Sequence, residues 1–315
     1  MQQPAFKILI IDRMHQSLLP MLEEAGFIAD YQPEIPASNV PAALQNANGL
    51  IVRSKVFVDD ALLVNANNLQ FVARAGAGVD NIAEAALAKR NIPLINAPEG
   101  NRDAVGEHCI GLLLALFRHI ISANTEVKRK IWNREDNRGE ELGSKTVGII
   151  GYGNMGQAFA RKLAGFGCQV LAYDKSKTRK PDQFAINCSL NDIFEKADVV
   201  SLHIPLTAQN RNFADEAFLR SFRKNIWLLN TARGEVLDQQ ALVALLQEGK
   251  IKGAALDVLE NEKLNSLTPL QQQSFEYLAS ATNVILSPHI AGWTHTSYEK
   301  INQILVQKIK ALLPA

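Results

Sequence analysis

Short apolar runs recur along the chain, and the segments between them carry apolar residues at helical spacing. In the first third, these runs predict buried strands at residues 6–11, 49–52, 69–73 and 93–96. A second series predicts six more strands, at residues 147–150, 169–173, 199–203, 226–230, 253–257 and 284–287. This alternation of strands and helices is typical of α/β folds in which helices cover both faces of a parallel sheet.

The two strand series are separated by a long helical pattern over residues 103–132 and a charged stretch over residues 133–144. A last helix is predicted over residues 297–312. At 315 residues the chain is longer than one typical domain. We therefore predict two domains, one of residues 1–100 with 290–315 and one of residues 101–289.

The strand predicted at residues 147–150 leads into a glycine turn. Gly151, Gly153 and Gly156 have the GxGxxG spacing and precede a helical stretch. The first glycine permits the tight turn, the second lets a pyrophosphate approach the backbone, and the third lets helix and strand pack closely. The sequence therefore predicts a dinucleotide site, whose turn also contains Tyr152, Asn154 and Met155.

The next strand ends at Asp174, where a carboxylate can accept the ribose hydroxyls of the cofactor. A carboxylate there would also repel the 2′-phosphate of NADP, so we predict NAD. Four basic residues follow and would soften this choice, unless they form only a solvated basic loop. They are Lys175, Lys177, Arg179 and Lys180.

Composition narrows the classes of protein that fit. The 33 basic and 32 acidic residues leave a formal charge of +1, which gives no electrostatic footprint for nucleic acid or an anionic membrane. The apolar run at residues 109–117 is interrupted by Arg118 and His119, well short of the roughly 20 residues of a membrane span. We expect a soluble protein.

The cysteines fit a reducing, cytoplasmic location, because they form no CxxC pair and no secretory leader precedes them. We expect Cys109, Cys168 and Cys188 to be small buried residues, and we expect no metal site. Four histidines, in helical or turn segments without evident partners, are expected at the surface or in the core. They are His15, His108, His119 and His295.

Titratable groups follow three of the predicted strands, at the strand ends where ligands of such sheets bind. The segments are NTARG at residues 230–234, DVLENE at residues 257–262 and SPH at residues 287–289. A dehydrogenase of 2-hydroxy acids needs a cation for the substrate carboxylate, a proton shuttle and a group that holds the shuttle. Arg233, His289 and Glu262 fit these roles.

Together with HIPLT at residues 203–207 and SPHIAG at residues 287–292, these motifs make the whole chain resemble the D-isomer-specific 2-hydroxyacid dehydrogenases. Within that family the chain resembles the D-3-phosphoglycerate dehydrogenase branch most. The resemblance implies a Rossmann-type doubly wound parallel sheet for the cofactor and a smaller flavodoxin-like α/β substrate domain. It also implies a homodimer built around residues 103–144.

The resemblance implies a role for each residue of the site. Arg233 would bind the carboxylate and carbonyl oxygen of the oxo acid, a planar target that suits a guanidinium. Glu262 would hydrogen-bond His289 and favour the imidazolium that gives its proton to the carbonyl. The resemblance, and not the spacing, selects Glu262 over Glu260. Asp257 would orient the nicotinamide carboxamide, and the other implied cofactor contacts are His203, Pro205, Thr207, Thr231, Ala232 and His289 itself.

Substrate choice is assigned to the loops after two strands of the first third. Arg53 and Arg74 would supply positive charge for a phosphate, although structural pairing with nearby acids is the alternative. Glycines of RAGAGVDN at residues 74–81 would offer N–H groups to a carboxylate. The remaining implied substrate contacts are Ser54, Gly76, Ala77, Gly78 and, reaching a partner subunit, Arg134.

We therefore expect NAD-linked oxidation of D-3-phosphoglycerate to 3-phosphohydroxypyruvate, the first step of serine synthesis. A hydroxypyruvate or glyoxylate reductase is the alternative within the same class, and it would need no phosphate site. A non-catalytic, NAD-sensing protein that binds a partner is the alternative from another class. Because the sequence ends at Ala315, we expect no serine-binding regulatory domain after it.

Overall fold

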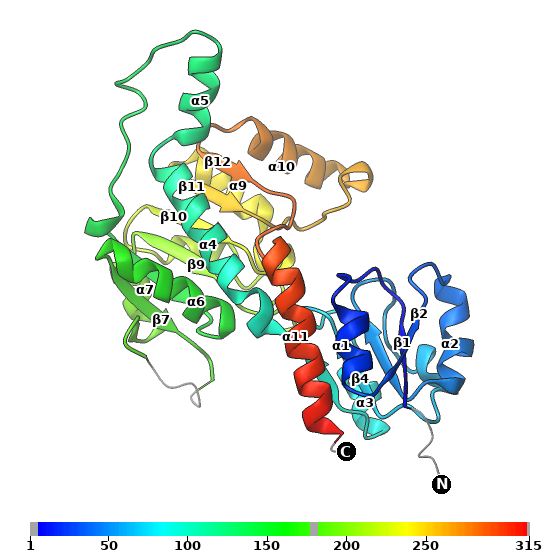
Figure 1. Ribbon diagram of the computed structural model, residues 1–315. Coiled ribbons are helices and arrows are strands. Elements are labelled where there is room, and N and C mark those ends of the chain that lie inside the picture. Colours follow the sequence, from blue (N-terminus) through cyan, green and yellow to red (C-terminus); the bar gives the residue numbers. More distant parts are fainter. Residues whose placement is uncertain (1–5, 177–181, 314–315) are drawn as a thin grey trace. The chain divides into compact units, whose positions relative to one another are not determined.

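The computed structural model describes residues 6–176 and 182–313, and the chain divides into two compact units (Figure 1). Unit 1 comprises Met1–Asn101 with Trp293–Ala315, and unit 2 comprises Arg102–Gly292. Each unit is built around its own parallel sheet. The predicted α/β class, with two domains, is confirmed, whereas the assignment of substrate and cofactor to one domain each stays a prediction.

Unit 1 contains a five-stranded sheet in the order β2-β1-β3-β4-β5, which is the strand order of flavodoxin-like folds. All its neighbouring strands run parallel. The strands are β1 (Lys7–Ile10), β2 (Ile28–Tyr31), β3 (Gly49–Val52), β4 (Phe71–Arg74) and β5 (Leu94–Asn96). The sequence pattern did not predict β2, because this edge strand has no buried residue and so no continuous apolar run.

Helices cover both faces of the unit 1 sheet. Successive residues of β1 point to opposite faces, so that Ile8 and Leu9 belong to different cores. The core around Leu9 includes residues of α2 (Val40–Ala43) and α3 (Glu84–Lys89). The core around Ile8 includes residues of α1 (Leu18–Glu24) and α11 (His295–Leu312), which lie side by side in Figure 1.

Unit 2 contains a seven-stranded parallel sheet in the order β12-β11-β10-β9-β6-β7-β8. Counted from β6 as the first strand, this is the Rossmann order 3-2-1-4-5-6 with one strand added. The strands are β6 (Thr146–Ile150), β7 (Gln169–Tyr173), β8 (Ile186–Asn187), β9 (Val199–Leu202), β10 (Ile226–Asn230), β11 (Ile251–Leu256) and β12 (Val284–Leu286). Only the two-residue edge strand β8 escaped the sequence pattern.

Helices also cover both faces of the unit 2 sheet. One face packs against α4 (Pro98–Phe117) and α6 (Asn154–Leu163), through residues such as Leu113 and Phe159. The opposite face packs against four further helices, through residues such as Ile193, Leu242 and Leu278. Those helices are α7 (Leu190–Lys196), α8 (Glu216–Arg220), α9 (Gln239–Gln247) and α10 (Pro269–Ser280). The sheet is therefore doubly wound, as predicted.

The continuous helix predicted over residues 103–132 is wrong. α4 ends at Phe117, His119 adopts a left-handed conformation with φ 50°, and α5 (Ile120–Lys128) then runs at 61° to α4. The carbonyl of Phe117 accepts the N–H of Glu140 at 2.9 Å instead of continuing the helical ladder. α5 has no buried residue, so no core contact holds it in line with α4.

Among the described residues, no single helix is long and apolar enough to cross a membrane. Only when α4 and α5 are taken together, as a pair bent at their junction, do they have the length and apolar composition of a membrane span.

Candidate functional site

The strand order of the unit 2 sheet reverses between β6 and β9, which are hydrogen-bonded neighbours. Loops that follow two such strands diverge, and ligands of doubly wound sheets bind between them. Gly151 follows β6 with φ +93°, and a Cβ built on it would lie 2.6 Å from the carbonyl oxygen of His203, which follows β9. Only glycine therefore allows the two loops to start this close together.

The glycine turn brings the amino end of α6 close to β6. Gly153 is the N-cap of α6, and a Cβ on Gly156 would lie 2.2 Å from the carbonyl oxygen of Gly151. The predicted cofactor contacts Tyr152, Asn154 and Met155 belong to this turn and to the first turn of α6. The N–H groups of a first helical turn bind phosphate groups, so this chain's own backbone fits a dinucleotide here.

Asp174, the predicted ribose contact, follows β7 and braces the glycine turn. Its carboxylate accepts the backbone N–H of Tyr152 at 2.8 Å and that of Ser176 at 2.8 Å. A carboxylate oxygen accepts more than one hydrogen bond, so the ribose contact stays compatible with this geometry. Lys175 is exposed, and the basic residues at 177, 179 and 180 lie outside the described residues.

The side chain of His203 contacts other residues of unit 2 and thus helps to hold the fold. Its Nε2 lies 2.8 Å from the hydroxyl of Ser201, and its ring contacts the ring of Phe159. Burial lowers the pKa of His203 to about 4, so the ring is neutral at pH 7. Further along the loop, Asn210 holds the two exposed residues that were also predicted to contact the cofactor, Pro205 through its carbonyl and Thr207 through its hydroxyl.

The turn after β10 is held by the amide of Asn230, which is fully buried. This amide donates to the carbonyl of Arg233 at 2.9 Å and accepts the N–H of Ala232 at 3.1 Å. The Arg233 guanidinium is half-buried and donates to the Ala232 carbonyl at 2.6 Å. Thr231 is buried, with its hydroxyl 3.3 Å from the sulfur of Cys109.

The turn after β10 also packs against the loop after β11. A Cβ on Gly234 would lie 1.9 Å from the carbonyl oxygen of Leu259. The loops that carry Arg233 and Glu262 are therefore in direct backbone contact.

Asp257, the residue after β11, has a fully buried side chain. Its carboxylate accepts the hydroxyl of Ser287 at 2.6 Å and the N–H groups of Ile290 at 2.9 Å and Ala291 at 2.8 Å. Burial by itself would raise the pKa of Asp257, but the hydrogen bonds from His108, Ser287 and the backbone outweigh it, and the pKa is lowered. Asp257 is therefore a buried carboxylate that clamps the loop after β12.

The clamped loop contains His289. The Asp257 carbonyl accepts the N–H of His289 at 2.7 Å, and His289 itself has a left-handed backbone with φ 54°. Its Nδ1 lies 2.9 Å from one carboxylate oxygen of Glu262 and 3.1 Å from the other. Glu260 has no such contact with His289 among the described residues. The other ring nitrogen of His289 is thus the one that remains for a substrate proton.

Two of the histidines that the sequence left without evident partners do have them. His15 is the first, because its Nδ1 lies 2.9 Å from the Ser17 hydroxyl. His108, on α4, is the second, because its Nε2 lies 3.1 Å from the Ser287 hydroxyl and 3.4 Å from the Asp257 carboxylate. The contact with Ser287 joins residues 179 positions apart, which no local pattern signals. His108 thus supports the clamp that holds the His289 loop. The neighbouring Cys109 is fully buried, as predicted, whereas the same prediction is wrong for Cys168 and Cys188, which are only half-buried.

The substrate contacts predicted in unit 1 follow β3 and β4. The guanidinium carbon of Arg53 lies 3.7 Å from the centre of the Trp293 ring, and Ser54 is exposed. Arg74 folds back over its own loop, where a Cβ on Gly76 would lie 1.8 Å from the Arg74 guanidinium. In the same loop, the Ala77 carbonyl accepts the amide of Asn96 at 2.8 Å, and Gly78 is half-exposed.

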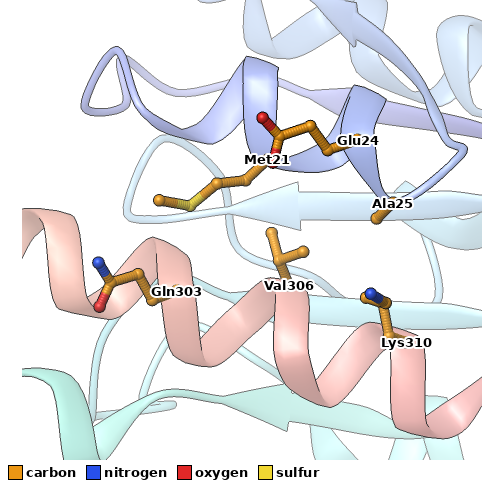
Figure 2. A pocket seen from close by; sticks show the side chains of 6 residues that line it. All are labelled: Met21, Glu24, Ala25, Gln303, Val306 and Lys310. Carbon is orange, nitrogen blue, oxygen red and sulfur yellow. The ribbon is translucent and has the colours of Figure 1, made fainter.

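Three other features lie apart from these loops. Arg134, predicted to reach a partner subunit, is exposed. No group of three or more His, Cys, Asp or Glu side chains that could hold a metal ion occurs within residues 6–176 and 182–313. A pocket between α1 and α11 contains no predicted site residue (Figure 2); its lining is Met21, Glu24, Ala25, Gln303, Val306 and Lys310.

Comparison with known proteins gives a consistent family. Residues 110–291 match the family described as D-isomer specific 2-hydroxyacid dehydrogenase, NAD binding domain. The chain is 33% identical to D-3-phosphoglycerate dehydrogenase of Methanocaldococcus jannaschii over 98% of its own length and 57% of that protein. It is 34% identical to hydroxypyruvate reductase of Thermotoga maritima over 82% of its own length and 83% of that protein.

Its fold is similar to that of D-lactate dehydrogenase from Aquifex aeolicus, solved with NAD and lactic acid, with a TM-score of 0.81. The two sequences are 26% identical, and the match covers 97% of this chain and 94% of the other. The chain spans only about half the length of the phosphoglycerate dehydrogenases that it matches, at 57% and 53% for two of them.

We expect Gly156→Ala to weaken NADH binding and to lower the free energy of unfolding by about 1–3 kcal/mol, because the new Cβ forces α6 away from the Gly151 carbonyl. NADH fluorescence titration and chemical denaturation measure the two effects. Gly165→Ala is the matched control, since no atom lies within 4 Å of its added Cβ. Equal behaviour of the two variants would contradict the assignment.

We expect Asp257→Asn to lower the free energy of unfolding at pH 7 by about 1–3 kcal/mol, because an amide cannot accept all the hydrogen bonds that the carboxylate accepts. The folded pKa of Asp257 is lowered, so its ionised form stabilises the fold above the unfolded pKa of about 3.9, and this stabilisation is lost as the pH falls through the folded pKa. Denaturation of both proteins from pH 7 downwards should show the difference narrowing in acid. A difference that does not depend on pH would contradict this account.

Proposed function

The chain belongs to the D-isomer specific 2-hydroxyacid dehydrogenase family, and from this premise we propose that it interconverts a D-2-hydroxy acid and the corresponding 2-oxo acid with NAD. The observation that carries the proposal is the contact between His289 and Glu262, at 2.9 Å, on a loop after β12. A histidine held by a carboxylate in this way is the usual device for moving a hydroxyl proton.

Three side chains of unit 2 each have one role in the reaction. NAD would supply the acceptor for the hydride from C2 of the hydroxy acid during oxidation, and NADH would supply the hydride donor during reduction. Arg233 binds the substrate carboxylate and the oxygen on C2, because its planar guanidinium can donate to both. His289 takes the proton of the C2 hydroxyl during oxidation and returns it during reduction. Glu262 holds the ring and stabilises its protonated form.

The cofactor is NAD rather than NADP in this proposal. The carboxylate of Asp174 supports the choice of NAD. Asp174 follows β7, where the ribose is bound in such folds, and its charge would repel the 2′-phosphate of NADP. The pyrophosphate is assigned to the turn from Gly151 to Gly156. The nicotinamide is assigned to the loops that carry Thr231 and Asp257.

We propose D-3-phosphoglycerate as the hydroxy acid, which would place the enzyme at the start of serine synthesis in the cytoplasm. The similarity to the phosphoglycerate dehydrogenase of M. jannaschii supports this substrate, as do two arginines, Arg53 and Arg74, in the loops after β3 and β4. Hydroxypyruvate is the second candidate. Its support is the similarity to the T. maritima hydroxypyruvate reductase, of which the match covers 83%.

We also propose that the protein is a homodimer through α5 and the segment after it. Apolar side chains are exposed there, and such patches mark association surfaces. Trp132 is 79% exposed, and the others are Ile120, Ile121, Val127 and Ile131. Arg134 follows directly on the chain and is the residue that would reach the partner subunit.

Purified protein with NADH should reduce 3-phosphohydroxypyruvate with a higher kcat/KM than hydroxypyruvate, glyoxylate or pyruvate, when NADH absorbance is followed. His289→Ala should lower kcat by about 100-fold or more, because the proton donor is lost, while the protein still binds NADH through the glycine turn. A preference for hydroxypyruvate would select the reductase. Tight NADH binding without turnover of any of these acids would contradict the enzymatic proposal.

Replacing Ile121 and Val127 by aspartate should convert the dimer into a monomer, because two buried unpaired charges per subunit would cost more than the interface gains. Sedimentation velocity measures the change in mass. The matched control is Val64→Asp on unit 1, where the valine is 60% exposed and lies outside the proposed interface. A wild-type protein that sediments as a monomer would overturn the proposal.

A further inference from the structure

The sheet of unit 1 has its own reversal of strand order, between β1 and β3. Asp12 lies just after β1 and is 8% exposed. Its carboxylate accepts the backbone N–H of Arg53 at 2.7 Å, that of Ser54 at 3.3 Å and that of Lys55 at 3.2 Å. The loop after β3 is therefore fixed where ligands of flavodoxin-like sheets bind.

The start of α11 brings two aromatic rings to the same place. Thr294 and Ser297 form a capping box that begins the helix. Trp293 precedes the cap and packs on Tyr298, with 4.9 Å between ring centres. This pairing of the residue before the cap with the fourth helical residue is a hydrophobic staple. The Tyr298 hydroxyl donates to the carbonyl of Arg13 at 2.7 Å, which joins the staple to the loop after β1.

Arg53 is stacked on this staple. Its guanidinium carbon lies 3.7 Å from the centre of the Trp293 ring and 5.4 Å from that of Tyr298. A stacked guanidinium keeps its N–H donors in the plane of the group, where they remain able to bind an oxyanion. The aromatic faces exclude water from the cation, and an anion binds a less hydrated cation more strongly. Burial also lowers the pKa of Arg53.

The neighbouring Arg13 shows the contrast. Arg13 forms an ion pair with Glu34 at 2.8 Å, and both side chains are largely exposed. Within the described part of the chain, no carboxylate forms such an ion pair with Arg53. The Asp12 carboxylate attracts the Arg53 charge, but its oxygens accept backbone N–H groups. The Arg53 guanidinium therefore keeps donors for a ligand, whereas Arg13 already has its anion.

We propose that Trp293 and Tyr298 are positioning residues that hold Arg53 as the receptor for the distal phosphate of the substrate. Trp293 is 47% exposed, so its ring also forms part of the surface that a ligand meets. This inference rests on the proposed function for the identity of the ligand. The new element is that the aromatic staple at the start of α11 also sets the substrate preference.

Inorganic phosphate tests the receptor without turnover. In the W132F/W227F protein, Trp293 is the only tryptophan, and its fluorescence should change saturably as phosphate is added. Arg53→Ala should abolish the saturable change. Arg13→Ala should retain it, because that guanidinium is paired with Glu34. No saturable response, or an equal response in the Arg53→Ala protein, would overturn the proposal.

Two replacements of Trp293 separate the receptor role from the staple. Trp293→Leu keeps an apolar staple but offers no aromatic face, whereas Trp293→Phe keeps both. We expect Trp293→Leu to raise the KM for 3-phosphohydroxypyruvate about five- to tenfold while the KM for hydroxypyruvate and the thermal midpoint stay near those of Trp293→Phe. Equal KM ratios for the two variants would show that the residue is only a staple.

The two proposals fail separately. If the wild-type enzyme reduces hydroxypyruvate and rejects the phosphorylated acid, the phosphoglycerate assignment is wrong. The phosphate titration still decides whether Arg53 and Trp293 form an anion receptor, because it requires neither substrate nor cofactor.

Discussion

Everything in the candidate site depends on one constraint, which is that all strands of each sheet run parallel. Parallel strands have their carboxyl ends on the same edge of the sheet, so the residues that follow them meet whatever their separation along the chain. In unit 2 this brings the glycine turn at Gly151, the arginine loop after β10 and His289 to one edge. In unit 1 it does the same for Asp12 and Arg53.

Within that edge, buried carboxylates set the backbone. Asp257 is the clearest case, because its side chain has no exposure and holds the N–H groups of Ile290 and Ala291. The loop that carries His289 therefore keeps its left-handed backbone because the Asp257 carboxylate stabilises it. The role implied by resemblance, a contact with the nicotinamide carboxamide, stays a prediction. The clamp is a second role that the sequence did not suggest.

The sequence predicted the central strands well because buried parallel strands are continuous apolar runs, as in β6, β9 and β10. It missed β2 and β8, because these two edge strands contain no buried residue and carry no such run. The break between α4 and α5 was also missed. The apolar spacing continues across this break, so the sequence does not reveal it. In the structure, α5 has no buried residue that would hold it in line with α4.

The site was predictable to the extent that its motifs are local. The glycine spacing identified the dinucleotide turn, whereas the choice of Glu262 over Glu260 came from resemblance, because two carboxylates two residues apart are equivalent by spacing. His108 and Trp293 could not be assigned in advance. Their contacts with Ser287 and Arg53 join residues that are far apart in the sequence, and such contacts follow from the winding of the sheets.

The central claim is hydride exchange between NAD and C2 of a D-hydroxy acid, and the transfer of deuterium tests it most directly. Reduction of 3-phosphohydroxypyruvate or hydroxypyruvate with NADH that carries deuterium at both positions on C4 of the nicotinamide, followed by mass spectrometry and chiral separation, identifies the product. We expect a D-configured hydroxy acid with one deuterium at C2. An L-configured product, or reduction without deuterium at C2, would contradict it.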